Sequence, residues 1–218
     1  MKKTLLYSLL LLFAACETDS YEKGQGKYSL MQADLSELTI DGEKRAVAFT
    51  TDDGDAYQLV NPFTAQWIGT PDTIYRMAIY YNKVEGQQAA EIVGLNALST
   101  LIPREHWRVQ EQPCDPVDIE SAWLAKNGKY INIGLMFKSG HIDDEEGTHA
   151  IGVVQDTVLI NNDQTRTAYY RFLHDQGDTP EFYTTRHYVS ILLPEERPDS
   201  VRLSVNTYHG VVERLFPL

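Results

Sequence analysis

The densest set of metal-binding side chains in this sequence is the segment HIDDEEGTH at residues 141–149. His141 and His149 bracket a run of carboxylates, Asp143, Asp144, Glu145 and Glu146. Oxygen ligands of this kind suit hard cations such as Ca²⁺, but the alternating acids, the central glycine and the distal glutamate of an EF-hand loop are missing. We therefore expect a solvated hairpin loop and assign no metal site. Weak divalent-ion binding by the carboxylates remains the alternative.

A second, smaller acidic group is formed by Asp52, Asp53 and Asp55 around Gly54. These carboxylates could hold a cation. Because they stand between two β-prone runs, and Asp and Gly are the residues that tight turns favour, a hairpin turn accounts for them without a ligand.

The sequence offers no recognisable catalytic machinery. None of its histidines stands in a metalloprotease HExxH pattern, and no GxSxG or phosphate-binding glycine loop is present. Neither a nucleophile nor a general base can therefore be named. We predict that the protein is not an enzyme, with a hydrolytic enzyme as the least favoured alternative, and we expect no cofactor.

Aromatic residues are the remaining candidates for ligand contact, since the chain has 13 tyrosines and three tryptophans. Aromatic rings with a polar edge can form a platform for a ligand or a partner protein. The residues expected to do so are Trp67, Tyr80 and Tyr81. The alternative is that these rings only fill the space between strands.

The amino terminus, MKKTLLYSLLLLFAAC, has the pattern of an export signal. Two lysines, an apolar run and two alanines before Cys16 form a secretory signal that resembles a lipobox. The apolar run is shorter than the roughly 20 residues that span a bilayer. We expect residues 1–15 to be a signal peptide, Cys16 to carry a diacylglyceryl group and a further acyl chain such as palmitate, and residues 16–28 to be a flexible tether.

The composition of the exported chain limits the classes of partner that it can bind. Its formal net charge is −12, and loss of the lysines in the signal makes the mature chain more acidic still. Nucleic-acid binding requires a basic stripe, which is absent, so we expect no nucleic-acid partner. If Cys16 carries lipid, Cys114 has no second cysteine to pair with, so no intrachain disulfide is expected.

Strand patterns dominate the mature chain and predict an all-β protein of two domains. In the first, residues 29–110, β-prone runs are separated by turns such as Asp41-Gly42, and residues 73–84 are apolar on both faces, as in the wall of a closed barrel. A linker rich in proline follows at residues 111–118. Alternating strands at a regular spacing in residues 119–218 predict an antiparallel β-sandwich.

The order of these parts, together with DGEKRAVAF at 41–49, YRMAIYYNK at 75–83, RHYVSILLP at 186–194 and DSVRLSVNTY at 199–208, resembles the NigD-like lipoproteins. The resemblance implies an OB-like five-stranded barrel followed by an antiparallel β-sandwich. It also implies an immunity-like role, because the family takes its name from a gene beside a bacteriocin gene. It implies no catalytic residues.

These observations predict a lipid-anchored protein of the cell envelope, in the outer membrane and facing either the periplasm or the exterior. The membrane is contacted through the lipid at Cys16, and the folded part binds a partner. An envelope protein bound in an immunity-like role is the favoured partner. A surface glycan is the alternative, since OB barrels commonly bind oligosaccharides as well as oligonucleotides.

Overall fold

The structure is a computed structural model that describes residues 29–142 and 145–218, with the backbone alone for residues 142, 145 and 146. In these ranges the chain forms β-strands and one short 3₁₀ turn, His106–Arg108, so the predicted all-β class is confirmed. The described part contains no helix long and apolar enough to span a bilayer. The predicted signal peptide at 1–15, the tether at 16–28 and the lipidated Cys16 lie outside the described residues.

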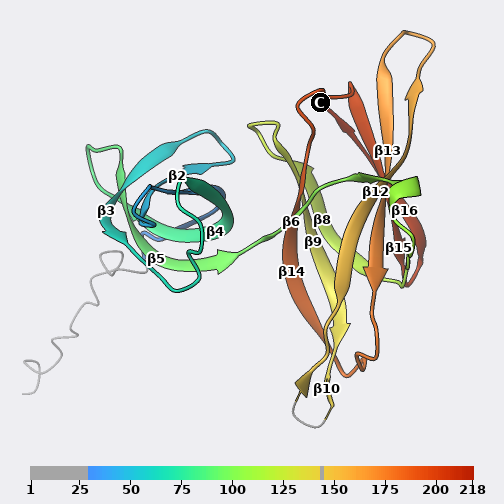
Figure 1. The fold of residues 1–218 in the computed structure, drawn as a ribbon, viewed down its shortest axis with the longest axis horizontal. Coiled ribbons are helices and arrows are strands. Elements are labelled where there is room, and N and C mark those ends of the chain that lie inside the picture. The colour runs from blue at the N-terminus through green and yellow to red at the C-terminus, as the bar shows by residue number, and fades with distance from the viewer. Residues whose placement is uncertain (1–28, 143–144) are drawn as a thin grey trace, which may run out of the picture.

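The first five strands close into a barrel in the order β1-β2-β3-β5-β4 (Figure 1). β3 and β5 are parallel and the other pairs are antiparallel. This is the Greek-key strand order of a five-stranded OB barrel, so the prediction from the resemblance is confirmed. The strands are β1 (Gln32–Ile40), β2 (Ala46–Thr51), β3 (Ala56–Phe63), β4 (Thr73–Lys83) and β5 (Ala89–Ala97).

The barrel encloses a core of alternate residues from each strand, as the period of two requires. Phe49, Tyr57 and Tyr81 meet at its centre with ring centroids 4.9–5.4 Å apart. Around them lie the aliphatic core residues Leu38, Ile40, Leu59, Met77 and Ile79.

Two sheets form the sandwich. One has the order β16-β15-β13-β12-β7 and the other β6-β14-β9-β8. Their inner faces share one core, to which β9 contributes Ile131, Ile133, Leu135 and Phe137. The strands are β6 (Ser99–Leu101), β7 (Arg104–Glu105), β8 (Asp118–Leu124), β9 (Tyr130–Ser139), β12 (Ala150–Ile160), β13 (Arg166–Asp175), β14 (Tyr183–Leu192), β15 (Ser200–Thr207) and β16 (Gly210–Pro217). A two-stranded ribbon, β10 (His141–Ile142) and β11 (Glu145–Glu146), extends from β9.

The chain passes from barrel to sandwich within a single residue. Ala97 still pairs with β4, the Leu98 amide donates to the Arg76 carbonyl at 3.0 Å, and Ser99 already pairs with β14. β6 and β7 therefore belong to the sandwich sheets, although the sequence places them in the 29–110 barrel domain. The run from Ala89 to Leu101 has the pattern of one continuous strand, and periodicity alone does not tell which sheet each half joins.

Candidate binding surface at the barrel–sandwich junction

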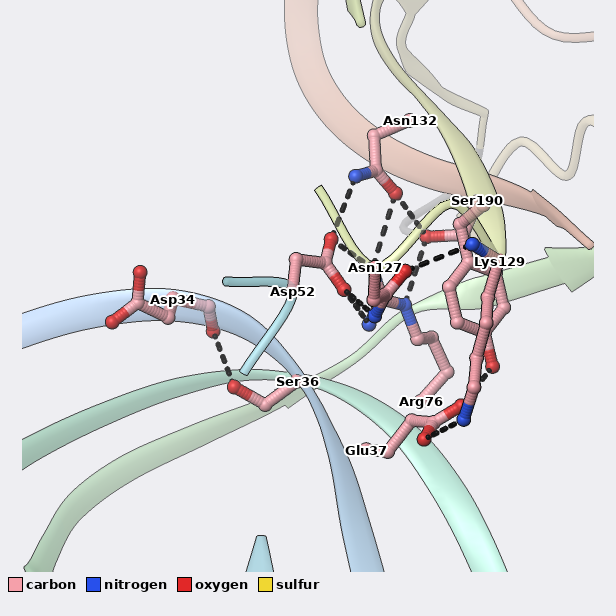
Figure 2. Close-up of polar contacts among 10 residues, drawn as sticks. Asp34, Ser36, Glu37, Asp52, Arg76, Asn127, Lys129, Asn132 and Ser190 are labelled. Carbon is pink, nitrogen blue, oxygen red and sulfur yellow. Dashed lines mark hydrogen bonds and ion pairs between the residues drawn. The ribbon is translucent and has the colours of Figure 1, made fainter. Parts of the chain in front are cut away.

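Arg76 is the centre of a buried polar network between the two domains. Its side chain is 3% exposed, and it donates a bidentate pair of hydrogen bonds to Asp52, 2.7 and 2.6 Å long. It also donates to Ser190 at 3.1 Å and to Asn132 at 3.1 Å, both on the sandwich (Figure 2). Bidentate arginine–carboxylate pairs of this kind are geometrically specific, so the network fixes the orientation of the barrel on the sandwich.

On the sandwich side of this network, the polar side chains also bind one another and Asp52. Asn132 donates to Asp52 at 2.8 Å, and Ser190 donates to Asn132 at 2.8 Å. Asn132 and Ser190 stand opposite each other on neighbouring strands β9 and β14. Neither residue is measurably exposed. The first six residues of β9 are buried on both faces, and on the outer face Tyr130 and Asn132 contact Arg76 of the barrel.

The turn between β8 and β9 adds a second layer of contacts. Lys126 bonds Asp53 at 2.6 Å, Asn127 donates to Asp52 at 3.3 Å, and Lys129 bonds Glu37 at 2.8 Å. In Figure 1 this turn extends from the sandwich toward the barrel. The acidic group predicted to be a hairpin turn is indeed at the β2–β3 turn, and two of its carboxylates bind cationic side chains of this chain across the junction.

The contacts at the junction lower the pKa of the Glu37 carboxyl group. Burial raises its pKa, but hydrogen bonds from Lys129 and from the Tyr130 hydroxyl outweigh burial, so the pKa lies below its ordinary value. Burial and the bond to Glu37 in turn raise the pKa of Tyr130. The tyrosine therefore remains a donor, and Arg76 lies 4.1 Å over its ring.

The three aromatic residues expected to form a ligand platform are not brought together. Tyr80 and Tyr81 are neighbours on β4 and so point to opposite faces. Tyr81 is 1% exposed in the barrel core, where its hydroxyl donates to Asp34 at 2.8 Å. Tyr80 is half-buried against Gly94 of β5. Tyr81 is therefore a packing residue, which corrects the expectation that it contacts a ligand.

Trp67 lines a cavity. It is 46% exposed and its ring meets that of Tyr75 edge to face, with centroids 5.4 Å apart. The Gly69 amide donates to the Tyr75 hydroxyl at 3.2 Å and ties this loop to β4. The cavity has a volume of about 570 Å³ and lies where the barrel meets the chain leading to the sandwich. Its lining is mostly apolar and includes Trp67, Ile74, Tyr75, Met77, Leu95 and Leu98.

The acidic segment predicted as a loop forms a short β-ribbon. His141 pairs with Glu146 and residue 142 with residue 145 through their backbones, while Asp143 and Asp144 lie outside the described residues. His149, the last residue of the segment, lies outside the ribbon and stacks on His174, with ring centroids 5.1 Å apart. Among the side chains that the structure describes, no three of His, Cys, Asp or Glu converge on a metal position.

Cys114 has a cationic neighbour that the sequence could not show. Its free thiol is half-buried, 3.5 Å from the guanidinium of Arg171. The same guanidinium binds Asp156 at 2.8 Å and Gln112 at 2.7 Å. These contacts fasten the proline-rich linker onto β13, so the linker is part of the sandwich surface.

Arg76, Asn132 and Ser190 were missed as site residues at the sequence level. The available signal was weak: each is a polar residue within a strand whose other positions are mostly apolar. A buried charge needs a partner, but the sequence does not reveal that the partners lie on different domains.

Neither the family models nor the curated proteins contain a match to this chain. Several solved structures are similar to this chain. A NigD-like immunity protein from Bacteroides caccae matches 84% of this chain and 91% of its own, with 21% identity and a TM-score of 0.65. A protein of unknown function, DUF1344, from Bacteroides vulgatus matches 86% and 91%, with 12% identity and a TM-score of 0.63.

A candidate lipoprotein from Bacteroides fragilis also matches, over 85% of this chain and 96% of its own, with 13% identity and a TM-score of 0.56. At these identities the likeness establishes a shared fold. The fold shared with the NigD-like immunity protein extends over most of both chains, as the sequence resemblance implied.

Proposed function

We propose that this chain is a lipid-anchored envelope protein of the NigD-like type that binds a partner protein in an immunity-like role. The observation that carries the proposal is the exposed aromatic and aliphatic cavity around Trp67, at a junction whose geometry is fixed by Arg76. Aromatic residues are enriched where proteins bind one another, and a preorganised surface loses less entropy on binding.

The shared fold supports the same reading, because one protein with this fold is described as an immunity protein and another as a candidate lipoprotein. Some immunity proteins act by binding a toxin, as in the colicin nuclease–immunity pairs, so the partner that we propose is a protein met at the cell envelope, such as a toxin. The lipid at Cys16 would hold the chain at the membrane surface, and a second acyl chain makes such an anchor stable. The proposal includes no catalytic step.

Photocrosslinking in intact cells tests the binding surface. A photoreactive amino acid at Ile74, which is 56% exposed and lines the cavity, should form an adduct with a partner protein. The matched control places it at Ile160, which is 70% exposed at the far end of β12. Adducts at Ile160 but none at Ile74, or none at either position, would contradict the proposal.

The anchor is tested separately. The Cys16→Ser variant should lose its lipid and leave the membrane fraction, while the wild-type chain remains there. A wild-type chain that incorporates no labelled palmitate would exclude lipidation at Cys16. A bacteriocin gene beside this gene would favour the immunity-like role over other partner-binding roles.

A surface glycan is the second candidate ligand, and the Trp67–Tyr75 pair is the observation that favours it. An exposed indole beside a second ring can stack on a sugar face. On a glycan array, binding should be lost in Trp67→Ala and kept in Trp107→Ala, which removes a tryptophan 66% exposed on the 3₁₀ turn, outside this cavity. An array without signal would remove this candidate.

A further inference from the structure

The strand β12 has a free edge where its hairpin with β13 extends beyond the rest of the sheet (Figure 1). Its pairing with β13 continues as far as Ile160. On the other side, β7 pairs only with Val154 and Gln155. Within the described part of the chain, residues 157–160 therefore have a strand on one side and none on the other. We call this side of residues 157–160 the β12 edge.

The side chains along the β12 edge are apolar and exposed. Val158 is 42% exposed, Leu159 is 48% exposed and Ile160 is 70% exposed. Because side chains alternate along a strand, Val158 and Ile160 lie on one face of the sheet and Leu159 lies on the other. Both faces of the edge thus expose apolar surface to solvent.

Residues 157–160, all of them described, lack the features that usually protect such an edge. Proteins blunt exposed edges with proline, charged side chains or a bulge. The sequence TVLINN at residues 157–162 contains neither charge nor proline, and the register shift in β12 falls before Thr157. The preceding carboxylate, Asp156, is bound to Arg171 at 2.8 Å. The edge is therefore suited to pairing with an uncharged strand.

The order of its side chains makes the β12 edge complementary to itself. Residues that stand opposite each other in an antiparallel pair lie on the same face of the sheet. If two copies meet about a two-fold axis at Leu159, Val158 of each copy stands opposite Ile160 of the other, and the two Leu159 side chains stand opposite each other. Thr157 is then opposite Asn161, so no charge enters the ladder. An axis one residue earlier or later leaves an apolar residue opposite a polar one.

We propose that two copies of this chain associate through the β12 edge, as an antiparallel strand pair about a two-fold axis at Leu159. Such a contact uses the same surface on both copies and closes after two. The occupant is a second copy because each copy supplies the apolar partner of the other. The whole chain has a net charge of −12, and the uncharged edge is where two acidic copies meet without like-charge contact.

The length of the edge sets the strength of the dimer. Stable interfaces bury at least roughly 1,200 Å² of surface, and so short an edge buries less. The dimer is therefore weak and forms at high protein concentration. It is separate from the Trp67 cavity and does not depend on the proposed function.

Disulfide cross-linking of the whole chain tests the register. Under oxidation by copper phenanthroline, Leu159→Cys should form a covalent dimer, because the axis places the two thiols opposite each other. Val158→Cys alone should form none, since the two Cα atoms of residue 158 would be about 8 Å apart, beyond the roughly 7 Å that a disulfide spans. Val158→Cys mixed with Ile160→Cys should form a linked pair. The wild-type chain controls for linkage through native thiols such as Cys114.

The absence of a linked Leu159→Cys dimer would overturn the proposal. Linkage of Val158→Cys to itself would overturn the axis at Leu159. A dimer that forms only where the pairing predicts it would support both.

Sedimentation at increasing protein concentration tests the association without a cross-link. Leu159→Lys should raise the dissociation constant of the dimer by about tenfold or more, because the axis places the two like charges opposite each other. Leu215→Lys is the matched control. It makes the same change at a side chain 52% exposed on β16, the strand at the other edge of this sheet, and should associate like the wild type. A wild-type chain that stays monomeric, or a Leu159→Lys chain that associates as well as the wild type, would contradict the proposal.

Photocrosslinking distinguishes this contact from the binding of a partner protein. A photoreactive residue at Ile160 should capture a second copy of the chain and give an adduct of twice the mass of the chain. An adduct at Ile74 should instead have the mass of the chain plus that of the partner. Failure of one proposal therefore leaves the other open to its own test.

Discussion

Arg76 of the barrel and Asn132 of the sandwich are joined by a hydrogen bond of 3.1 Å across 56 residues of sequence. Both residues also bind the same carboxylate, that of Asp52. Because one carboxylate accepts hydrogen bonds from both domains, neither domain can rotate against the other without exposing or breaking a buried ion pair. The relative position of the domains is therefore part of the folded state.

The Arg76→Ala variant should be strongly destabilised. Removal of one partner of a buried ion pair leaves the other charge uncompensated and typically costs about 3–5 kcal/mol. Here Asp52 would lose a bidentate partner, and Asn132 and Ser190 would lose a donor. Urea denaturation of both proteins measures the change in the free energy of unfolding. A loss below about 1 kcal/mol, the value of an exposed pair, would contradict the buried role.

The matched control is Arg202→Ala, which breaks an ion pair with Glu213 on an exposed strand pair. Exposed pairs contribute about 0–1 kcal/mol, so this variant should remain close to the wild type. Small-angle scattering adds a second readout, because only the change at Arg76 should loosen the arrangement of the two domains.

Glu37 predicts a pH dependence of stability. Its pKa in the folded state lies below the ordinary value of 4.5 because Lys129 and Tyr130 donate to the carboxylate. A lowered folded-state pKa adds stability that is complete above the unfolded value and is lost as the pH falls through the folded value. Between about pH 6 and pH 3 the Glu37→Gln variant should therefore lose less stability than the wild type.

Denaturant titrations at several pH values measure this difference directly. Glu43→Gln serves as the control, since Glu43 is 74% exposed and away from the junction. It should keep the wild-type dependence on pH. Parallel curves for Glu37→Gln and the wild type would show that the Glu37 carboxylate contributes nothing to the acid sensitivity of the fold.

The strands were predictable because their signal is local. The Asp41-Gly42 turn, the two-faced apolar pattern of β4 and the alternation of β9 follow from the period of two in side-chain direction. The closed barrel and the sandwich also followed from the resemblance, which rests on several strands taken together. The closed barrel and the two packed sheets were confirmed. The prediction that the sandwich is antiparallel was wrong in part, because β13 pairs with β15 in parallel, as β12 does with β7 and β14 with β6.

What could not be predicted depends on contacts between distant residues. Nothing local distinguishes Arg76 from an exposed strand arginine, because its partners Asn132 and Ser190 are 56 and 114 residues away. Likewise, Tyr80 and Tyr81 are chemically identical neighbours, and only the closure of the barrel decides which one is buried. The same holds for Cys114, whose cationic neighbour comes from β13.

The two tyrosines give a direct test of their assignment to opposite faces. Tyr81→Ala opens the barrel core beside Phe49 and should cost about 3–5 kcal/mol, as for other large aromatic core residues. Tyr80→Ala should cost less, because this residue is half-buried on the outside. Urea denaturation ranks the two variants. Equal losses, or a greater loss at Tyr80, would contradict the placement of Tyr81 in the core.

The turn that carries the second layer of the junction depends on Gly128. Its φ of 69° lies in the left-handed region, which costs an alanine about 1 kcal/mol or more. A Cβ there would also meet the end of the Arg197 side chain at 2.7 Å. Since Asn127 and Lys129 flank this glycine and bind Asp52 and Glu37, strain in the turn should weaken the junction as well as the turn.

Gly128→Ala should therefore lower the free energy of unfolding by about 1–2 kcal/mol and also reduce the pH dependence that comes from Glu37, because displacement of Lys129 removes one donor to that carboxylate. Gly69→Ala is the control, because a Cβ at Gly69 meets nothing within 4 Å and its φ is not left-handed. Urea denaturation at neutral and acid pH measures both effects. A Gly128→Ala protein that is less stable but keeps the wild-type pH dependence would show that a change in this turn does not disturb the hydrogen bonds to Glu37.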